Sequence, residues 1–286
     1  MAAPTKLTTI PFRNGFDLAP YEIDALGIVT FTDGFVSNIT PNQTQCEGYG
    51  YTYDRAEGVC RAQSFTLGLD SANVNNTAKG NGNTFELGTD NSSVIGENNT
   101  VRGLSRNNII VGNQNEIANS VNNAFVYGTL GEATANNSIV LGGNAPTDNL
   151  SERQSIHLMY GAQTTAAGTV DSYLNNISGN YFTIPENTAM YFHADVLAVR
   201  VGGTGTGSTG DFASFVERGV VINKSGTLSI SRERDAIKSS GTVTNWRPTA
   251  TVDGTNFIID VRGATDVTIE WASNIRFTQI KTGVAL

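Results

Sequence analysis

Short apolar runs that end in glycine recur along residues 64–161, and they constrain the fold more than any other feature. Seven runs follow this pattern: SFTLG (64–68), TFELG (84–88), SSVIG (92–96), NIIVG (108–112), AFVYG (124–128), SIVLG (138–142) and IHLMYG (156–161). Steps of 8, then 16 and finally 14 residues separate successive members of the series Gly80, Gly88, Gly96, Gly112, Gly128 and Gly142. Repetition at a short period is typical of a solenoid, in which each coil stacks on the previous one.

The length and flanks of these runs predict short strands joined by tight corners. Each run is only four or five residues long before its glycine, which suits a strand better than a helix. Asparagine pairs lie between the runs, at 75–76, 98–99, 107–108, 122–123 and 136–137. Glycine and asparagine tolerate the left-handed backbone region that corners require. Asparagine-rich sequence can also be disordered, but the regular phase of the apolar runs favours a folded coil.

Both faces of the predicted strands are apolar. A strand alternates its side chains, so Ile139 and Leu141 point one way while Val140 points the other. A single coil has one interior and can bury only one of these faces. We therefore expect a homo-oligomeric β-roll, in which copies of the chain cover the second face under closed cyclic symmetry.

The repeats resemble those of a known class of protein. The pattern N-[NST]-x-[IV]-x-[LVY]-G, seen as NNAFVYG at 122–128 and NNSIVLGG at 136–143, is similar to the head repeats of trimeric autotransporter adhesins and to repeats in tailed-phage fibres. The resemblance covers about a third of the chain. It implies a β-roll and a homotrimer, and it implies no ligand.

Charge and hydropathy exclude several classes of function. The net charge of −8 disfavours a nucleic-acid partner, because phosphates require clustered lysine and arginine. No stretch of about 18 apolar residues predicts a membrane span. Residues 1–20 show no continuous apolar core of a secretion signal. We therefore expect a virion component made in the host cytoplasm, rather than an exported bacterial adhesin.

Residues 1–62 are predicted to form an N-terminal attachment segment with a cysteine-flanked hairpin. Prolines interrupt the first 20 residues, and two interpretations stay open: a docking segment, or strands that cap the first coil. Within 41–60, Tyr49, Tyr51 and Tyr53 alternate toward a turn. Cys46 and Cys60 would lie close enough to form a disulfide, but cytoplasmic synthesis would first leave them reduced. Two cysteines alone do not make a zinc site.

The rest of the chain is predicted to be all-β as well. The repetitive β-roll spans 63–161, a connector spans 162–180, and a C-terminal antiparallel β-sandwich spans 181–286. The segments 184–199, 212–222 and 257–280 resemble the C-terminal domain of tailed-phage fibre and virion proteins. That resemblance implies a trimeric virion domain without catalytic residues.

Candidate sites yield no catalytic, cofactor-binding or metal-binding assignment. The glycines of 205–210 fit G-x-G-x-x-G, but no βαβ unit surrounds them. His157 and His193 lie in apolar strands, where a structural role is expected. A cluster of six charges reads as surface ion pairs, although an intersubunit acid pair stays open: Glu217, Arg218, Arg232, Glu233, Arg234 and Asp235.

Neither the aspartates near the coil corners nor the N-x-[ST] sequons are interpreted as functional sites. Asp70, Asp90 and Asp148 lack the spacing of a calcium loop and are expected to be solvated turn residues. Sequons such as Asn38-Ile39-Thr40 follow from the abundance of asparagine, and no glycosylation is expected without export.

These observations predict a homotrimeric structural fibre of a bacteriophage virion that aids adhesion to the host. We favour a head fibre on the capsid over a tail fibre. The expected partners are copies of the chain, capsid or tail proteins bound through residues 1–62, and a host surface glycan or protein. No enzymatic activity and no cofactor are expected. The alternatives are a glycan-processing tail spike and a bacterial trimeric surface adhesin.

Overall fold

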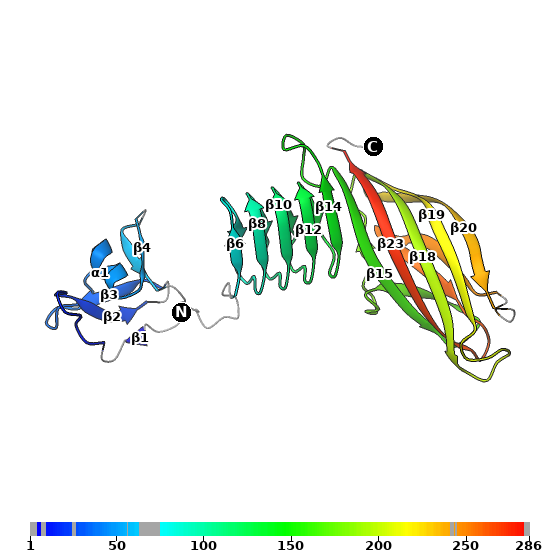
Figure 1. Ribbon diagram of the computed structural model, residues 1–286, viewed down its shortest axis with the longest axis horizontal. Coiled ribbons are helices and arrows are strands. Elements are labelled where there is room, and N and C mark those ends of the chain that lie inside the picture. Colours follow the sequence, from blue (N-terminus) through cyan, green and yellow to red (C-terminus); the bar gives the residue numbers. More distant parts are fainter. Residues whose placement is uncertain are drawn as a thin grey trace. The chain divides into compact units, whose positions relative to one another are not determined.

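The computed structural model describes residues 5–6, 10–24, 27–55, 57–62, 75–240, 243 and 245–282 (Figure 1). The run SFTLG and Asp70 lie outside these residues. The chain divides into two compact units, residues 1–74 and residues 75–286. Apart from one short helix, the regular structure of the described residues is β, which confirms the predicted fold class.

The first unit contains a small sheet, a helix and a hairpin. An antiparallel sheet has the order β1 (Thr5–Lys6), β2 (Ala19–Ile23) and β3 (Val29–Thr32), and a hairpin joins β4 (Thr52–Asp54) to β5 (Val59–Arg61). The expected hairpin unit is thus smaller than 41–60, because α1 (Gln43–Gly48) occupies its first part. Asn42 caps this helix in a capping box with Gln45, a local signal that favours a helix start.

A disulfide and aromatic rings form the core of this first unit. Cys46 and Cys60 are bridged, with a Cα–Cα distance of 5.6 Å, which resolves the question left open by the sequence. The rings of Tyr49 and Tyr51 pack edge-on against the buried ring of Phe31, at centroid distances of 5.7 and 6.3 Å. A bridge of this kind compensates for the small apolar core that so short a unit can build.

The second unit begins with the predicted solenoid. One parallel sheet contains β6 (Thr77–Lys79), β8 (Ser93–Glu97), β10 (Ile109–Asn113), β12 (Phe125–Thr129) and β14 (Ile139–Gly143). The opposite sheet contains β7 (Thr84–Phe85), β9 (Thr100–Val101), β11 (Glu116–Ile117) and β13 (Glu132–Ala133). Adjacent strands pair in register, so that Gly96, Gly112, Gly128 and Gly142 lie side by side.

Backbone conformation explains why glycine and asparagine recur. Gly112 has φ +136°, and a Cβ atom there would overlap the carbonyl oxygen of Gly128 in the next coil. Asparagines at the corners adopt φ values between 54° and 58°, as at Asn98, Asn107, Asn123 and Asn137. The predicted role of the asparagine pairs as corner residues is therefore confirmed.

The interior of the solenoid is a narrow apolar column flanked by polar ladders. The second residue of β8, β10, β12 and β14 is buried, as are its counterparts on the short strands: Val94, Ile110, Val126 and Val140 face Val101, Ile117 and Ala133. Asparagines stack beside this column at the 16-residue spacing of Asn83, Asn99 and Asn115, and the last two are buried. Their side chains bond backbone groups of neighbouring coils, which satisfies polar groups that water cannot reach.

Two antiparallel layers follow the solenoid. The first continues from β14 through β15 (Arg153–Thr164), β23 (Thr268–Lys281), β18 (Thr188–Gly202), β19 (Phe212–Lys224) and β20 (Thr227–Ser239). The second contains β16 (Thr169–Leu174), β17 (Phe182–Thr183), β21 (Arg247–Asp253) and β22 (Asn256–Arg262). Phe192, Phe257 and Phe277 join the layers, with ring centroids 5.0 Å apart. This packing is that of a β-sandwich.

The boundaries inside this second unit differ from those expected. Because β14 pairs with β15, the solenoid and the sandwich share one continuous sheet (Figure 1). The range 162–180, expected to be a connector, contains the end of β15 and all of β16. The inward-facing positions of these strands hold small and polar residues such as Ala162, Thr164 and Ser172, all of which are buried. Hydropathy alone therefore does not identify this range as strand.

Candidate functional site

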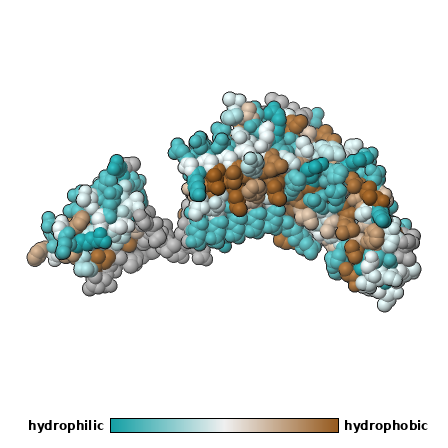
Figure 2. All heavy atoms as spheres, in the orientation of Figure 1, coloured by the Kyte–Doolittle hydropathy of each residue, from teal (hydrophilic) through white to brown (hydrophobic). Residues whose placement is uncertain are grey.

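An apolar stripe runs along the outer face of the long-stranded solenoid sheet. It consists of two columns in register, one of Ile109, Phe125 and Ile139 and the other of Ile95, Val111, Tyr127 and Leu141. Figure 2 shows apolar side chains gathered over this part of the molecule. Five of the seven are exposed, with Tyr127 at 55% and Leu141 at 42%. A contiguous apolar patch on a protein surface marks an interaction site.

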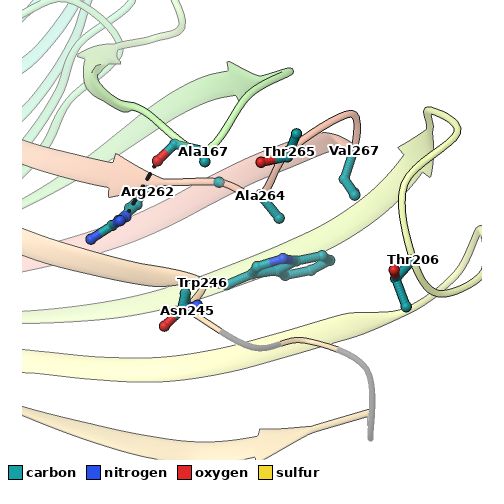
Figure 3. A pocket seen from close by; sticks show the side chains of 9 residues that line it. Ala167, Thr206, Asn245, Trp246, Arg262, Ala264, Thr265 and Val267 are labelled. Carbon is teal, nitrogen blue, oxygen red and sulfur yellow. Dashed lines mark hydrogen bonds between the residues drawn. The ribbon is translucent and has the colours of Figure 1, made fainter.

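A pocket lies at the end of the second unit, between the loops that connect its strands (Figure 3). We call it the terminal pocket; its volume is about 260 Å³, and its lining residues are Ala167, Thr206, Asn245, Trp246, Arg262, Gly263, Ala264, Thr265 and Val267. Figure 3 shows the indole of Trp246 lying below the loop that carries Ala264 and Thr265, with Thr206 beyond the far end of the ring. The pocket thus combines an aromatic ring, a guanidinium group, an amide and hydroxyl groups.

The glycine-rich segment 205–210 contributes Thr206 to the lining of the terminal pocket. The buried guanidinium of Arg200 donates hydrogen bonds of 2.8 to 3.1 Å to four carbonyl oxygens, those of Gly202, Gly203, Gly205 and Thr206. The amide of Gly205 donates to the carbonyl of Asp266 at 2.7 Å, which ties this loop to the loop that follows β22. The segment enters strand β19 rather than a helix, so it has no dinucleotide-binding context.

A pair of carboxyl groups lies on the outer face of the smaller layer. Asp171 on β16 and Asp260 on β22 are directly opposite each other, and their side chains are hydrogen-bonded. The hydroxyl of Tyr181 donates to Asp171 Oδ2 at 2.6 Å, and the Tyr181 ring packs on Tyr173. Burial, together with the neighbouring carboxylate of Asp171, raises the pKa of Asp260 to about 6.

This carboxyl pair provides an acid and a base, but its spacing differs from that of glycosidases. Glycoside hydrolysis requires two carboxyl groups about 5 to 10 Å apart, so that a sugar or a water fits between them. Hydrogen-bonded carboxyls are closer than that and share a proton. Sequence reasoning missed the pair, because Asp171 lay in the presumed connector and Asp260 in a strand with apolar neighbours.

The charged cluster of β19 and β20 splits between two faces. Arg218 pairs on the surface with Glu233 and with Asp235, the latter at 3.1 Å, as expected for surface ion pairs. The expectation is wrong for Glu217, which is fully buried. Alternation along β19 turns Glu217 toward the interior, where Arg232 and Arg234 lie 3.8 and 3.9 Å from it. Burial raises the pKa of Glu217.

The two histidines lie on the outer face of the large sheet. His157 is opposite Ile139, next to the apolar stripe, and both burial and the nearby charge of Arg276 lower its pKa. His193 lies 3.2 Å from Asp195 on the same strand. Their expected structural role stays a prediction.

The remaining residues considered from sequence lie in turns and corners. Asp90 forms a β-bridge with Arg106 at a solenoid corner. Asp148 accepts from the amide of Ala145 and pairs with Arg153 at 2.7 Å. Asn38 adopts φ 63° in a loop of the first unit.

Nowhere in the described ranges do three or more histidine, cysteine or acidic side chains gather as potential metal ligands. None of the described helices has the length and apolar character needed to cross a bilayer.

Known proteins similar to this chain are found only through structure. No protein family profile and no curated protein sequence matches it. The tailspike of Acinetobacter baumannii phage AM24 matches at 10% identity and a TM-score of 0.30, covering 68% of this chain and 41% of that one. The tailspike of Acinetobacter phage vB_ApiP_P1 matches at 12% identity and a TM-score of 0.23, covering 75% of this chain and 57% of that one.

A third tailspike, from Acinetobacter baumannii bacteriophage Fri1, is a capsular polysaccharide depolymerase. It matches at 6% identity and a TM-score of 0.23, covering 64% of this chain and 39% of that one. The present chain therefore spans between about two fifths and three fifths of these tailspikes. Similarities of this size do not transfer a site, a ligand or an activity.

The comparison contradicts the prediction that the protein is not an enzyme, because the matched tailspikes include a polysaccharide depolymerase. The prediction rested on the lack of linear catalytic motifs. Acidic groups need not be close in sequence to meet, and Asp171 and Asp260 show this directly.

Proposed function

We propose that this chain is the subunit of a homotrimeric, tailspike-like fibre of a bacteriophage virion that engages a host surface glycan. The apolar stripe carries the proposal, because it leaves large side chains such as Tyr127, Ile139 and Leu141 in contact with water on a single chain. The repeats that resemble those of trimeric adhesins and phage fibres support the trimer, and trimeric display multiplies weak contacts through avidity.

A second copy of the chain is the occupant that fits the stripe best. Each coil adds the same two outward apolar positions, in register with the coil before it. A surface with this regular spacing is complementary to another copy that carries the same spacing. Closed cyclic symmetry then covers the stripe on every subunit.

The first unit supplies a feature suited to attachment on the particle. Phe35 is 98% exposed at the tip of a loop. Asp33 Oδ1 accepts hydrogen bonds from the amides of Phe35 and Val36 at 2.8 and 2.7 Å, which fix the loop. These bonds also lower the pKa of Asp33. A rigid loop with a protruding aromatic ring is the kind of anchor that fills a partner's pocket.

Sedimentation of the full chain tests the trimer. The wild type should sediment as three chains of 30.3 kDa each. Ile139→Asp places a charge in the stripe and should shift the mass toward one chain. Thr134→Asp, at an exposed position outside the stripe, is the matched control and should remain trimeric. A wild type that is monomeric and well folded at micromolar concentration would contradict the proposal.

Pull-down with purified host capsule tests glycan engagement, and copy counting tests the mounting. Wild-type trimer should be retained on capsule from a sensitive host and not on a capsule-free mutant. Quantitative mass spectrometry of particles then separates a head fibre, at tens of trimers, from a tail-mounted fibre, at about six or twelve.

Glycan processing is the second candidate function, and the carboxyl pair is the acidic group to test for it, although its two carboxyls are closer together than those of glycosidases. Asp260, with a pKa of about 6, changes its protonation state around pH 6 beside the second carboxyl of Asp171, and the Tyr181 hydroxyl completes the group. Incubation of the assembled trimer with capsule, followed by size-exclusion chromatography of the polysaccharide, tests this activity. Shortening that is lost in Asp171→Asn would support a role for the pair, whereas unchanged polysaccharide length would remove the candidate.

A further inference from the structure

We infer that the terminal pocket binds an anionic sugar residue, whose carboxylate is recognised by Arg262 together with its neighbour Arg247. The inference rests on the proposed glycan engagement and names the site and the chemical class of the ligand. Three observations support the inference: an arginine pair without a carboxylate partner, a pocket lined by hydrogen-bonding groups, and walls that are held in place before a ligand binds.

The arginine pair is the first observation. Arg247 on β21 and Arg262 on β22 are directly opposite each other in the antiparallel register. Like charges at directly opposite positions are destabilising. Among the residues that the structure describes, no carboxylate lies within salt-bridge distance of either guanidinium. The fold therefore keeps an unfavourable charge arrangement that an anionic ligand would relieve.

Arg262 is held in an orientation that leaves donors available. Its Nε donates to the carbonyl oxygen of Ala167 at 3.3 Å, as the dashed line in Figure 3 shows. A guanidinium presents five N–H donors in a planar fork that matches a carboxylate. One anchored donor fixes the plane of the group, and the terminal nitrogens can then form the charge-assisted bonds that dominate anion recognition.

The remaining lining of the pocket suits the rest of a sugar ring. Trp246 supplies apolar surface, Asn245 supplies an amide, and Thr206 and Thr265 supply hydroxyl groups. Sites for small molecules combine an apolar surface with a few placed polar groups. The volume of about 260 Å³ is slightly below the usual range of about 300 to 1,000 Å³ for such sites, which indicates one sugar residue rather than a long segment of chain.

The walls of the pocket are fixed by buried contacts. Arg200 is 4% exposed and holds the loop that carries Thr206. Trp246 packs on Trp271, whose indole nitrogen donates to Thr164 Oγ1 at 3.0 Å. A site organised in advance loses less entropy on binding, so a single sugar residue can bind measurably.

The test compares anionic oligosaccharides with neutral counterparts of the same size. Tetrasaccharides that contain glucuronate, galacturonate or N-acetylneuraminate are each paired with the carboxyl-reduced form, and binding to the full-length protein is measured by calorimetry. Tryptophan fluorescence gives a second readout, because the chain has only two tryptophans. We expect at least one anionic probe to bind and its reduced form to bind about 10- to 100-fold more weakly.

Three variants locate the binding. Arg262→Gln should weaken binding of the anionic probe by about 10-fold or more, and Arg247→Gln by a smaller factor, because Arg247 lies beside the pocket and not in its lining. Arg106→Gln removes the same charge from an exposed corner of the solenoid and should bind as the wild type does. Unchanged thermal unfolding of each variant shows that a loss of binding is not a loss of fold.

The outcomes separate this inference from the proposed function. If the wild type binds host capsule while Arg262→Gln binds every probe equally well, the pocket assignment fails and glycan engagement stands. The inference also fails if no anionic probe binds, if the reduced forms bind equally, or if inorganic phosphate at the probe's concentration abolishes binding. If the wild type ignores capsule but its pocket binds a probe through Arg262, the proposed function fails and the pocket assignment stands.

Discussion

Replacing Asn115 with alanine should loosen the solenoid strongly, because this side chain joins three consecutive coils. It is 1% exposed. Its Nδ2 donates to Asn99 Oδ1 at 3.1 Å and to the carbonyl of Gly128 at 2.8 Å, and its Oδ1 accepts from the amide of Gly131 at 2.8 Å. Asn99 makes the equivalent bonds to Asn83 and Gly112 one coil earlier.

The expected loss follows from what alanine leaves behind. A buried amide without a partner costs about 1 to 3 kcal/mol, and each hydrogen bond made in the native state contributes about 1 kcal/mol net. The Gly131 amide loses its side-chain acceptor, and the other two bonds disappear as well. We therefore expect the free energy of unfolding to fall by about 3 to 5 kcal/mol.

Urea unfolding and native-state hydrogen exchange measure this loss. Both are run at one protein concentration, because subunit association contributes to apparent stability. Exchange at the Gly131 amide should accelerate strongly, since that amide loses its acceptor. Asn119→Ala, at an exposed asparagine in the same coil, is the matched control and should change stability by less than about 0.5 kcal/mol. If the two variants unfold alike, the asparagine ladder does not hold the coils together.

Three further predictions concern other parts of the chain. Gly112→Ala should abolish soluble folded protein or lower its stability by several kcal/mol, because Gly112 has φ +136° and an added Cβ would overlap the Gly128 carbonyl. Circular dichroism and thermal melting measure this loss, and a variant that melts as the wild type does would refute the prediction. Burial and Asp171 raise the pKa of Asp260 from 3.8 to about 6, so the native state binds a proton that the unfolded state releases. Stability should therefore fall as pH rises from about 4 to 6, by about 1 kcal/mol after solvent screening, and Asp260→Asn should flatten this dependence in urea titrations at both pH values. Phe35→Ser should leave melting unchanged yet reduce incorporation into particles in a complementation assay, and full incorporation would count against the anchor.

Ile139, Val140 and Leu141 show how much of the fold the sequence could predict. Val140 is fully buried, whereas Ile139 and Leu141 are 48% and 42% exposed, as strand alternation requires. Glycine spacing predicted the register, because a repeat of fixed length brings equivalent residues side by side. Trimer formation stays a prediction, since it depends on a surface that a single chain leaves open.

Other elements could not be read in the same way, because their signals are weak or non-local. Glu217 looked like a surface residue among charged neighbours, and only the pairing of β19 with its neighbours shows which face it occupies. Ala162 and Ser172 gave no apolar alternation, since small and polar residues fill the space between the two layers. Helix α1 depends on a capping box, a signal short enough to occur often by chance.

The terminal pocket could be predicted from the sequence only in part. Its arginine pair could be predicted, whereas its walls could not. The dipeptide Asp253-Gly254 is a turn signal, and Asp253 pairs with Asn256 across the turn. Counting outward from a two-residue turn places Arg247 opposite Arg262, so the uncompensated arginine pair follows from hairpin register alone. The other wall does not follow, because Thr206 reaches the pocket only through the hydrogen bonds of the buried Arg200. Local register can thus reveal a charge pair, whereas the walls of the pocket depend on contacts between distant strands.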